Sequence, residues 1–290
     1  MYLPDFEYFV PESIAETCQL LSQFGSKAKV LSGGTDIIIK MKNGLLAPEA
    51  LISLKNFEQL RKIEYVPGKG VVIGARVTHN EIVFSELLQE KYLSVSNAAQ
   101  QMATNQVRHK GTVGGNISNA VPSADLPPIL IALNATVTVV GTKGERSLAL
   151  ADVFTGPNTT CLAQDEIITE VIIPDQEMNC STYIKYGLRK SGALAVVGVA
   201  VALNVENNII KDARVVLGAV AATPMRTKKT EDFLKGKEIS EELLAEAGTI
   251  AAGESKPISD IRASAEYRRD MVRVFTKRAL RKAIDEGRHI

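Results

Sequence analysis

Apolar and polar residues at the start of the chain follow a pattern that predicts alternating helices and strands. Apolar side chains recur at helical spacing between Pro11 and Gly25, so we expect a helix over residues 12–24 that ends at the glycine. Short apolar runs at residues 28–31 and 50–54 predict two strands, with a second short helix between them. This N-terminal stretch is therefore expected to form a small α/β unit.

Beyond about residue 56 the pattern favours strand pairs and further helices. Residues 63–66 and 71–75 flank a Pro-Gly-Lys-Gly turn, which favours a β-hairpin. A capping box begins at Thr78 and predicts the start of a helix. The expectations for this part are helices at 78–88 and 93–103, an irregular Gly-, Asn- and Pro-rich passage at 111–128, and strands at 135–140 and 166–173.

The last part of the chain predicts a hairpin followed by helices. Two long apolar runs, residues 195–205 and 210–220, surround Glu-Asn-Asn, which is typical of a tight turn between strands. Helices are expected at 228–234, 241–252 and 264–285. The predicted fold class is therefore α+β, in three consecutive parts over residues 1–56, 57–177 and 178–290.

Composition and charge exclude several classes of protein. With 34 Lys+Arg against 33 Asp+Glu the formal net charge is +1, which argues against nucleic-acid binding through bulk electrostatics. The longest apolar stretch, residues 193–203, is too short to cross a membrane, and the first residues are acidic where a signal peptide is basic. The three cysteines and three histidines are scattered, so we expect no metal site and a cytoplasmic protein.

The first candidate for chemistry is the turn Ser32-Gly33-Gly34-Thr35-Asp36, between a predicted strand and a predicted helix. Two glycines let the backbone approach a ligand closely, because no Cβ stands in the way. The helix that follows would direct unpaired N–H groups at a phosphate. A plain strand-to-helix turn is the alternative, since neither the dinucleotide GxGxxG nor the P-loop motif is present.

A second glycine-rich segment runs from Gly111 to Asn119. A diphosphate has many acceptor oxygens, so it requires many donors with little steric bulk around them. This segment offers backbone N–H groups together with the side chains of Thr112, Asn116 and Ser118. A polar surface loop is the alternative, but two such segments in one chain favour diphosphate binding.

Two charged residues complete the candidate set. Asp125 lies between the glycine-rich passage and an apolar run, where it would either cap a helix or accept hydrogen bonds from a cofactor. Lys185 shares one face of a predicted strand with Tyr183 and Arg189, which indicates either a solvated basic edge or an ammonium group over a cofactor. No nucleophile and base can be paired, so no catalytic residue is predicted and a cofactor is expected to carry the chemistry.

In order and spacing these motifs resemble those of the FAD-binding (medium) subunits of molybdenum hydroxylases, the xanthine dehydrogenase and carbon monoxide dehydrogenase family. The first family motif stands here at residues 32–36, and the second at 112–119, followed by Val-Pro-Ser-Ala-Asp-Leu-Pro-Pro at 121–128. Further family segments stand at residues 154–157, 222–226 and 264–269, so the resemblance covers nearly the whole chain.

The resemblance implies a vanillyl-alcohol-oxidase-like (PCMH-type) FAD-binding fold of two lobes plus a C-terminal α+β domain of the carbon monoxide dehydrogenase flavoprotein type. In this family both glycine loops hold the FAD diphosphate, and the family's aspartate and flavin-proximal lysine match Asp125 and Lys185. The cofactor-binding residues implied are Leu31, Ser32, Gly33, Gly34, Thr35, Asp36, Ile37, Ala103, Thr112, Val113, Gly114, Gly115, Asn116, Ser118, Asp125, Leu162, Ile168 and Lys185.

The resemblance also implies a function and partners. Substrate would be oxidised at a molybdenum cofactor on another subunit, electrons would pass through 2Fe–2S clusters on a third, and FAD here would deliver them to NAD⁺ or another acceptor. Leu194 stands where carbon monoxide dehydrogenases commonly have an aromatic residue, which favours the purine or N-heterocycle dehydrogenase branch. The alternatives are the FAD subunit of a carbon monoxide or nicotinate dehydrogenase, a stand-alone flavin oxidoreductase of the same fold, and a non-redox nucleotide-binding module.

The predicted C-terminal helix has two contrasting sides. Val272, Phe275 and Ala279 follow the spacing of a buried stripe. The other side is basic and carries Arg268, Arg269, Arg273, Lys277, Arg278, Arg281 and Lys282. Besides a solvated face, this side is compatible with an acidic surface on a partner subunit, because the arginine fork binds carboxylates through two hydrogen bonds.

Overall fold

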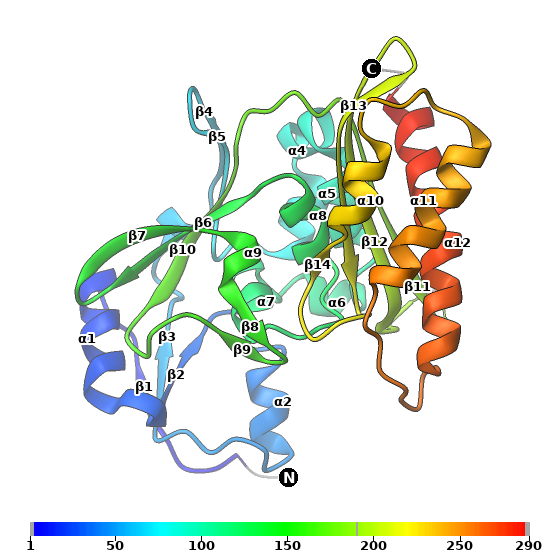
Figure 1. The fold of residues 1–290 in the computed structure, drawn as a ribbon. Helices are drawn as coiled ribbons and strands as arrows, with labels where there is room; N and C mark the ends of the chain where they lie inside the picture. Colours follow the sequence, from blue (N-terminus) through cyan, green and yellow to red (C-terminus); the bar gives the residue numbers. More distant parts are fainter. Residues whose placement is uncertain (1–2, 190, 288–290) are drawn as a thin grey trace.

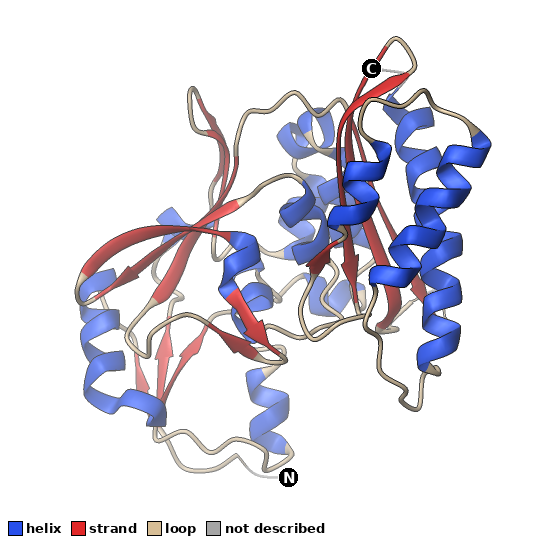
Figure 2. Ribbon diagram, in the orientation of Figure 1, coloured by secondary structure: helices blue, strands red, loops and turns tan. Residues whose placement is uncertain are grey.

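Three main β-sheets follow one another along the chain, with helices packed against them (Figures 1 and 2). The computed structural model describes residues 3–189 and 191–287. The sheets use strands from residues 7–53, 63–173 and 180–226 in turn. The predicted divisions at 56 and 177 fall between these sheets, and the three parts as separate domains stay a prediction. Within the described residues no helix combines the length and apolar character that a membrane crossing needs.

The N-terminal sheet is parallel, in the order β1–β3–β2. Its part of the chain contains β1 (Glu7–Phe9), α1 (Ile14–Phe24), β2 (Ala28–Leu31), α2 (Ile37–Lys42) and β3 (Ala50–Ser53). The predicted first helix begins two residues later than expected, because the hydroxyl of Ser13 caps it by accepting from the N–H of Glu16. Strand β1 escapes sequence prediction, since its three residues pair on one side only and carry little alternation.

The middle sheet is antiparallel, in the order β4–β5–β10–β6–β7. It contains β4 (Ile63–Val66), β5 (Gly70–Gly74), β6 (Thr136–Gly141), β7 (Gly144–Ala149) and β10 (Ile167–Ile173), and β8 (Phe154–Gly156) pairs with β9 (Thr159–Thr160) beside it. Strand β7 was unexpected because it is a mostly exposed edge strand of polar residues. Ile167 of this sheet packs into the core of the N-terminal unit, so the first two parts share buried contacts.

The helices of the middle part correct two expectations. They are α3 (His79–Phe84), α4 (Glu86–Lys91), α5 (Leu93–Gln100), α6 (Asn105–Arg108), α7 (Val113–Asn119), α8 (Leu126–Ala132) and α9 (Leu150–Val153). The helix predicted for residues 78–88 is broken at Ser85, whose hydroxyl accepts from the N–H of Leu88 and starts a new helix. The passage at 111–128 is largely helical, because Thr112 caps α7 and two prolines occupy the first turn of α8, where no N–H partner is needed.

The C-terminal sheet is antiparallel, in the order β11–β12–β13–β14, and lies between two layers of helices (Figure 1). This part contains β11 (Cys180–Gly187), β12 (Ala195–Glu206), β13 (Ile209–Gly218), β14 (Met225–Arg226), α10 (Lys228–Leu234), α11 (Glu241–Glu254) and α12 (Ala265–Gly287). The predicted hairpin turn is confirmed, since Asn207 and Asn208 have φ of 49° and 65°. Helices α5 and α8 of the middle part cover one face, and α10 and α12 cover the other.

Helix α12 packs its apolar side on this sheet as predicted, with Val272 and Ala279 fully buried. The predicted basic side is wrong for Arg268, which is buried at 1% exposure. The Arg268 guanidinium donates to the carbonyl oxygens of Val196 and Ala219 and pairs with Asp260, so it braces the turn before α12.

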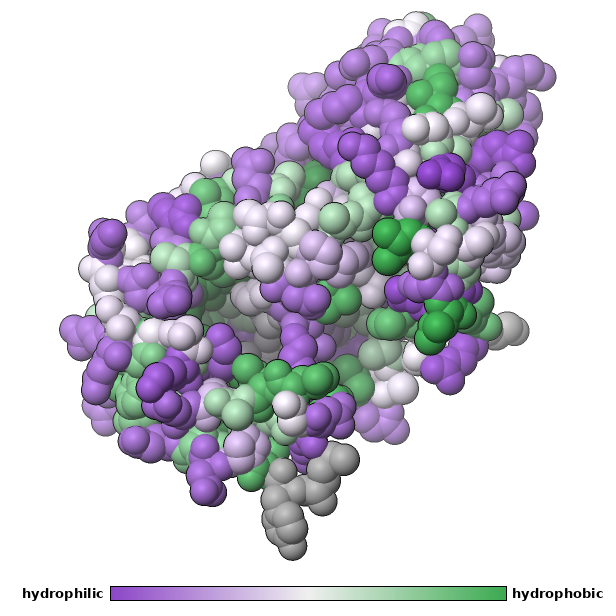
Figure 3. Space-filling view, turned by 60° about the horizontal axis from the view of Figure 1, so that its bottom comes forward, coloured by the Kyte–Doolittle hydropathy of each residue, from purple (hydrophilic) through white to green (hydrophobic). Residues whose placement is uncertain are grey.

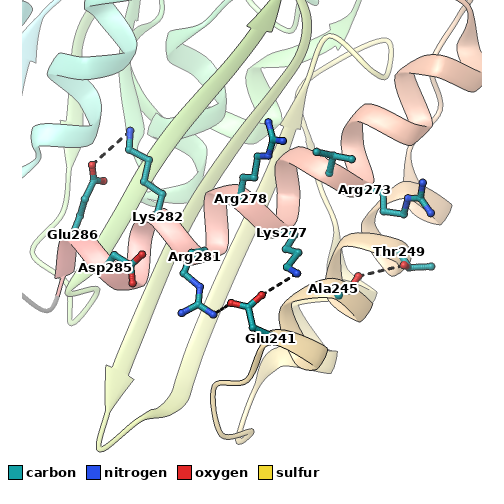
Figure 4. Close-up of a pocket in the computed structure, with 11 residues that line it drawn as sticks. Glu241, Ala245, Thr249, Arg273, Lys277, Arg278, Arg281, Lys282, Asp285 and Glu286 are labelled. Carbon is teal, nitrogen blue, oxygen red and sulfur yellow. Dashed lines mark hydrogen bonds and ion pairs between the residues drawn. The ribbon is translucent and has the colours of Figure 1, made fainter.

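The remaining basic residues of α12 other than Arg269 border a groove of about 710 Å³ between α11 and α12 (Figure 4). Glu241 of α11 pairs with both Lys277 and Arg281, and Lys282 pairs with Glu286 on its own helix. Much of the positive charge is therefore matched within the chain. Docking of an acidic partner on this face stays a prediction.

Candidate functional site

The two glycine-rich segments predicted to bind a diphosphate meet in the structure. The hydroxyl of Thr112, just before α7, donates to the hydroxyl of Ser32 over 3.1 Å, although 80 positions separate the two residues. Gly33 packs directly on the second segment, because an added Cβ would lie 1.9 Å from the carbonyl oxygen of Lys110. Glycine at position 33 is thus required by the contact between the two loops.

The first loop keeps backbone donors unpaired. Gly34 adopts a φ of +75°, a conformation that favours glycine, where the chain turns from β2 towards α2. Within the described residues the N–H groups of Gly33, Gly34 and Thr35 have no acceptor. Successive N–H groups in such a turn form the kind of concavity that binds phosphate oxygens. This arrangement fits the diphosphate expected at Leu31 to Ile37.

The second segment differs from expectation in how its backbone is used. The N–H of Val113 donates to the carbonyl of Val77 over 3.0 Å, and that of Gly114 to the carbonyl of Ala75 over 2.9 Å. The N–H of Gly115 is taken by the helix cap. These groups dock α7 beside β5 and are not available to a ligand, so side chains carry most of what this segment can offer.

Helix α7 still presents two positions to a ligand. Gly115 is exposed, and an added Cβ there would meet only the Thr112 hydroxyl, at 3.0 Å. The Oδ1 atom of Asn116 is buried and has no hydrogen-bond partner within the described residues. An unsatisfied buried acceptor costs about 1–3 kcal/mol unless a ligand or water supplies the donor. These features fit FAD, whose diphosphate accepts hydrogen bonds and whose hydroxyl and amino groups donate them.

Asp125 forms a second, separate cluster with two residues of β11. Its Oδ1 accepts from the phenol of Tyr183 over 2.8 Å, and its Oδ2 accepts from the ammonium group of Lys185 over 2.7 Å. The Lys185 ammonium also donates to the carbonyl of Gln101 over 3.1 Å. Asp125 makes no capping bond to α8, so the interpretation of this residue as a simple helix cap is wrong.

Burial and charge act in opposite directions on this cluster. The side chains of Asp125 and Lys185 are only 7% and 9% exposed. Burial raises the pKa of Asp125, while the Lys185 ammonium and the two hydrogen bonds act to lower it. Burial, reinforced by the Asp125 charge, raises the pKa of Tyr183 well above its usual value, so the phenol keeps its proton and acts as the donor.

The more weakly implied residues lie in different surroundings. Ala103 has an unusual φ of 39°, and its carbonyl accepts from the N–H of Gly192. Ala103 lies two positions after Gln101, whose carbonyl accepts from the Lys185 ammonium. Leu162 and Ile168 pack in the core of the middle part, Ile168 at 4% exposure. Contacts of these residues with a cofactor stay a prediction.

Sequence reasoning missed two polar contacts around the candidate site. The ammonium group of Lys40 on α2 donates to Oδ1 of Asn119 on α7 over 2.8 Å and links the N-terminal unit to the middle part. Tyr183 was placed on the same strand face as Lys185, but its partner Asp125 could not be inferred from strand alternation alone. Both contacts join residues distant in sequence.

The surface around the candidate site is mixed in character. A cavity of about 360 Å³ lies beside Lys185 and is bordered by Gln101 and Gly192. Figure 3 shows one face of the molecule hollowed near its middle, with apolar atoms in separate small patches among polar ones. The lining of the cavity beside Lys185 includes the polar side chains of Gln101, Arg189 and Ser191, which suits a polar ligand.

Comparison with known proteins agrees with this geometry. Residues 4–176 match the FAD binding domain in molybdopterin dehydrogenase, and residues 182–283 match the CO dehydrogenase flavoprotein C-terminal domain. The glyceraldehyde dehydrogenase medium chain of Sulfolobus acidocaldarius is 31% identical over 97% of this chain and 99% of its own. The nicotine 6-hydroxylase medium subunit of Paenarthrobacter nicotinovorans is 35% identical, over 97% and 98%.

A solved structure gives the same result for the fold. A chain of carbon monoxide dehydrogenase from Hydrogenophaga pseudoflava superposes with a TM-score of 0.95 at 32% identity, covering 98% of this chain and 99% of that one. The fold and the FAD cofactor implied by the sequence motifs are therefore confirmed. The chain belongs to the molybdenum hydroxylase family, as an FAD-binding medium subunit and hence as a component of an oxidoreductase.

Proposed function

We propose that this chain holds FAD between the paired glycine loops and the Asp125–Lys185 cluster, and that electrons from iron–sulfur clusters on a partner subunit reach NAD⁺ or another acceptor there. Bound FAD supplies the electron- and hydride-transfer chemistry. The observation that carries the proposal is the junction of the two loops at Ser32 and Thr112: the first loop keeps N–H groups without an acceptor, and the second carries the unsatisfied Asn116 oxygen.

The chain's own residues have distinct tasks in this proposal. The N–H groups of Gly33, Gly34 and Thr35 bind diphosphate oxygens, and Asn116 accepts from a hydroxyl or amino group of the cofactor. Asp125 orients the cofactor, and the Lys185 ammonium stabilises negative charge that accumulates on reduction. The loops exclude side-chain bulk from the diphosphate, because glycine has no Cβ.

The proposed partners are a molybdenum-cofactor subunit and a 2Fe–2S subunit of the same complex. Cys18, Cys161 and Cys180 are widely spaced along the sequence and do not follow the spacing of a cluster-binding motif, which supports clusters on a partner subunit. The matched relatives carry the names "medium chain" and "medium subunit". We place the complex in the N-heterocycle branch, supported by Leu194 in the position that is commonly aromatic in carbon monoxide dehydrogenases, and in the cytoplasm.

The extent of the two family matches supports the predicted division of the chain. Residues 1–56 and 57–177 would be the two FAD-binding lobes and 178–290 the C-terminal domain. The boundary at 177 is supported by the family matches, which change over between 176 and 182. The shared core around Ile167 supports lobes that fold together.

The test is purification of the tagged chain from its own host, with absorbance spectra and identification of the chains that accompany it. We expect a flavin spectrum and two co-purifying chains, one with molybdenum and one with iron. Reduction of the complex by its substrate, followed by addition of NAD⁺, would show NADH formation if NAD⁺ is the acceptor. A chain that is flavin-bound and active alone would favour the stand-alone oxidoreductase instead.

A further inference from the structure

Two glycines make room in the C-terminal sheet beneath the start of α8. Gly198 on β12 pairs with both Lys185 on β11 and Gly218 on β13, so the two glycines are neighbours across the sheet. An added Cβ on Gly198 would lie 2.6 Å from the phenol oxygen of Tyr183. An added Cβ on Gly218 would lie 2.9 Å from Cγ of Pro128 in α8.

This space brings α8 and β11 within hydrogen-bond reach. Pro128 packs over Gly218, and Asp125 precedes the same helix, so close approach of the helix carries the Asp125 carboxylate over the sheet. Tyr183 fills the space over Gly198 and donates to one oxygen of that carboxylate, while Lys185 donates to the other. Side chains in place of either glycine would separate these groups.

The hydroxyl of Tyr183 is not needed for packing. The side chain is 1% exposed within an apolar core cluster, where a phenylalanine ring would fill nearly the same volume. A hydroxyl buried among apolar groups costs free energy unless it is hydrogen-bonded, and its partner here is Asp125. The hydroxyl therefore serves the carboxylate.

We propose that Tyr183 is a positioning residue of the flavin site, whose hydroxyl fixes one oxygen of Asp125 so that the other holds the Lys185 ammonium in place. This inference rests on the proposed function of Asp125 and Lys185. Without the hydroxyl, Oδ1 of Asp125 loses its donor in a buried site. The carboxylate then becomes easier to protonate, and a protonated Asp125 holds Lys185 only weakly.

The test compares Tyr183→Phe with Tyr186→Phe, a matched control on the same strand. The Tyr186 phenol bonds to Tyr267 on the α12 side of the sheet, so its removal deletes one hydroxyl away from Asp125. The measurements are the FAD dissociation constant of the full chain from pH 5 to 9, and the flavin midpoint potential. We expect about tenfold weaker FAD binding for Tyr183→Phe, the size of one hydrogen bond to a charged group.

The pH profile separates positioning from general packing. Binding that needs ionised Asp125 weakens as pH falls, and in Tyr183→Phe this loss should begin at higher pH than in the wild type, with a shifted midpoint potential. Tyr186→Phe should match the wild type in both. Gly198→Ala displaces the Tyr183 hydroxyl, so FAD binding should again be lost at higher pH than in the wild type. The double variant Gly198→Ala, Tyr183→Phe should have nearly the same pH profile as Tyr183→Phe alone.

Two results would overturn the inference in distinguishable ways. A wild-type chain that binds FAD, with Tyr183→Phe indistinguishable from Tyr186→Phe in affinity, pH profile and potential, would refute the role of Tyr183 alone. A folded wild-type chain that does not bind FAD would refute the proposed function of the site, and this inference with it.

Discussion

An added side chain should lower stability at one glycine of the candidate FAD site and leave stability nearly unchanged at another, while weakening FAD binding at both. Gly33→Ala places a Cβ 1.9 Å from the carbonyl oxygen of Lys110, where ordinary contacts are 3.4–4 Å. The obstacle is backbone of the opposing loop, so the two loops must separate. Overpacking of this kind lowers the free energy of unfolding by about 1–3 kcal/mol. We expect a loss of about 3 kcal/mol here, because a backbone carbonyl cannot move aside as a flexible side chain can.

Gly115→Val should instead leave stability nearly unchanged and prevent cofactor binding. The new Cβ meets only the Thr112 hydroxyl, at 3.0 Å, and Gly115 is exposed at the surface of α7. Valine is at least as good a helix former as glycine, so the net change in unfolding free energy should stay within about 1 kcal/mol. If FAD occupies that space, its affinity should fall at least tenfold, which corresponds to about 1.4 kcal/mol.

The control is Gly253→Val, the same substitution at an exposed site of α11 where an added Cβ meets nothing within 4 Å. Urea denaturation of the apo-proteins measures stability, and titration with FAD measures affinity. We expect a lower urea midpoint for Gly33→Ala only, and weaker FAD binding for Gly33→Ala and Gly115→Val. Full FAD affinity in folded Gly115→Val would refute the placement of the cofactor beside α7, and wild-type stability of Gly33→Ala would refute the loop contact.

Three further predictions use other parts of the structure. Lys185→Met should lower the flavin midpoint potential in spectroelectrochemical titration, because the ammonium stabilises the reduced flavin; an unchanged potential would assign Lys185 to Asp125 alone. Burial lowers the pKa of His79 to about 4. Between pH 6.5 and 4 the unfolded chain therefore binds a proton at this residue that the folded chain does not. The free energy of unfolding should fall by about 3 kcal/mol as pH falls through this range. His79→Gln should flatten this dependence in denaturation curves at pH 4.5 and 7, and an equally steep curve would point to another group. Replacing the exposed Arg269 and Arg273 by glutamate should weaken complex assembly in gel filtration, most at low salt where charge is least screened, whereas normal assembly at every salt concentration would leave this face to solvent.

The repeating patterns of the sequence determined most of the secondary structure. The third-part helix predicted at 228–234 matches α10 residue for residue, and the hairpin turn is confirmed at Asn207 and Asn208. These features depend on residues a few positions apart, whose spacing is visible in the sequence. Strand β7 was missed because an exposed edge strand of polar residues has no apolar alternation. The glycine motifs, in order with the further family segments, also determined the family, and the two family matches together cover residues 4–176 and 182–283.

Tertiary packing decided which hydrogen bonds and contacts the candidate site residues make. The sequence could not show that the N–H groups of Val113 and Gly114 donate to carbonyl groups just after β5, or that Ser32 meets Thr112. It placed Arg268 on an exposed face, whereas the structure buries it against carbonyl oxygens. The Asp125 carboxylate meets Tyr183 because two glycines in the sheet let α8 approach closely. Each contact joins residues far apart along the chain, so it depends on how helices and sheets pack rather than on local spacing.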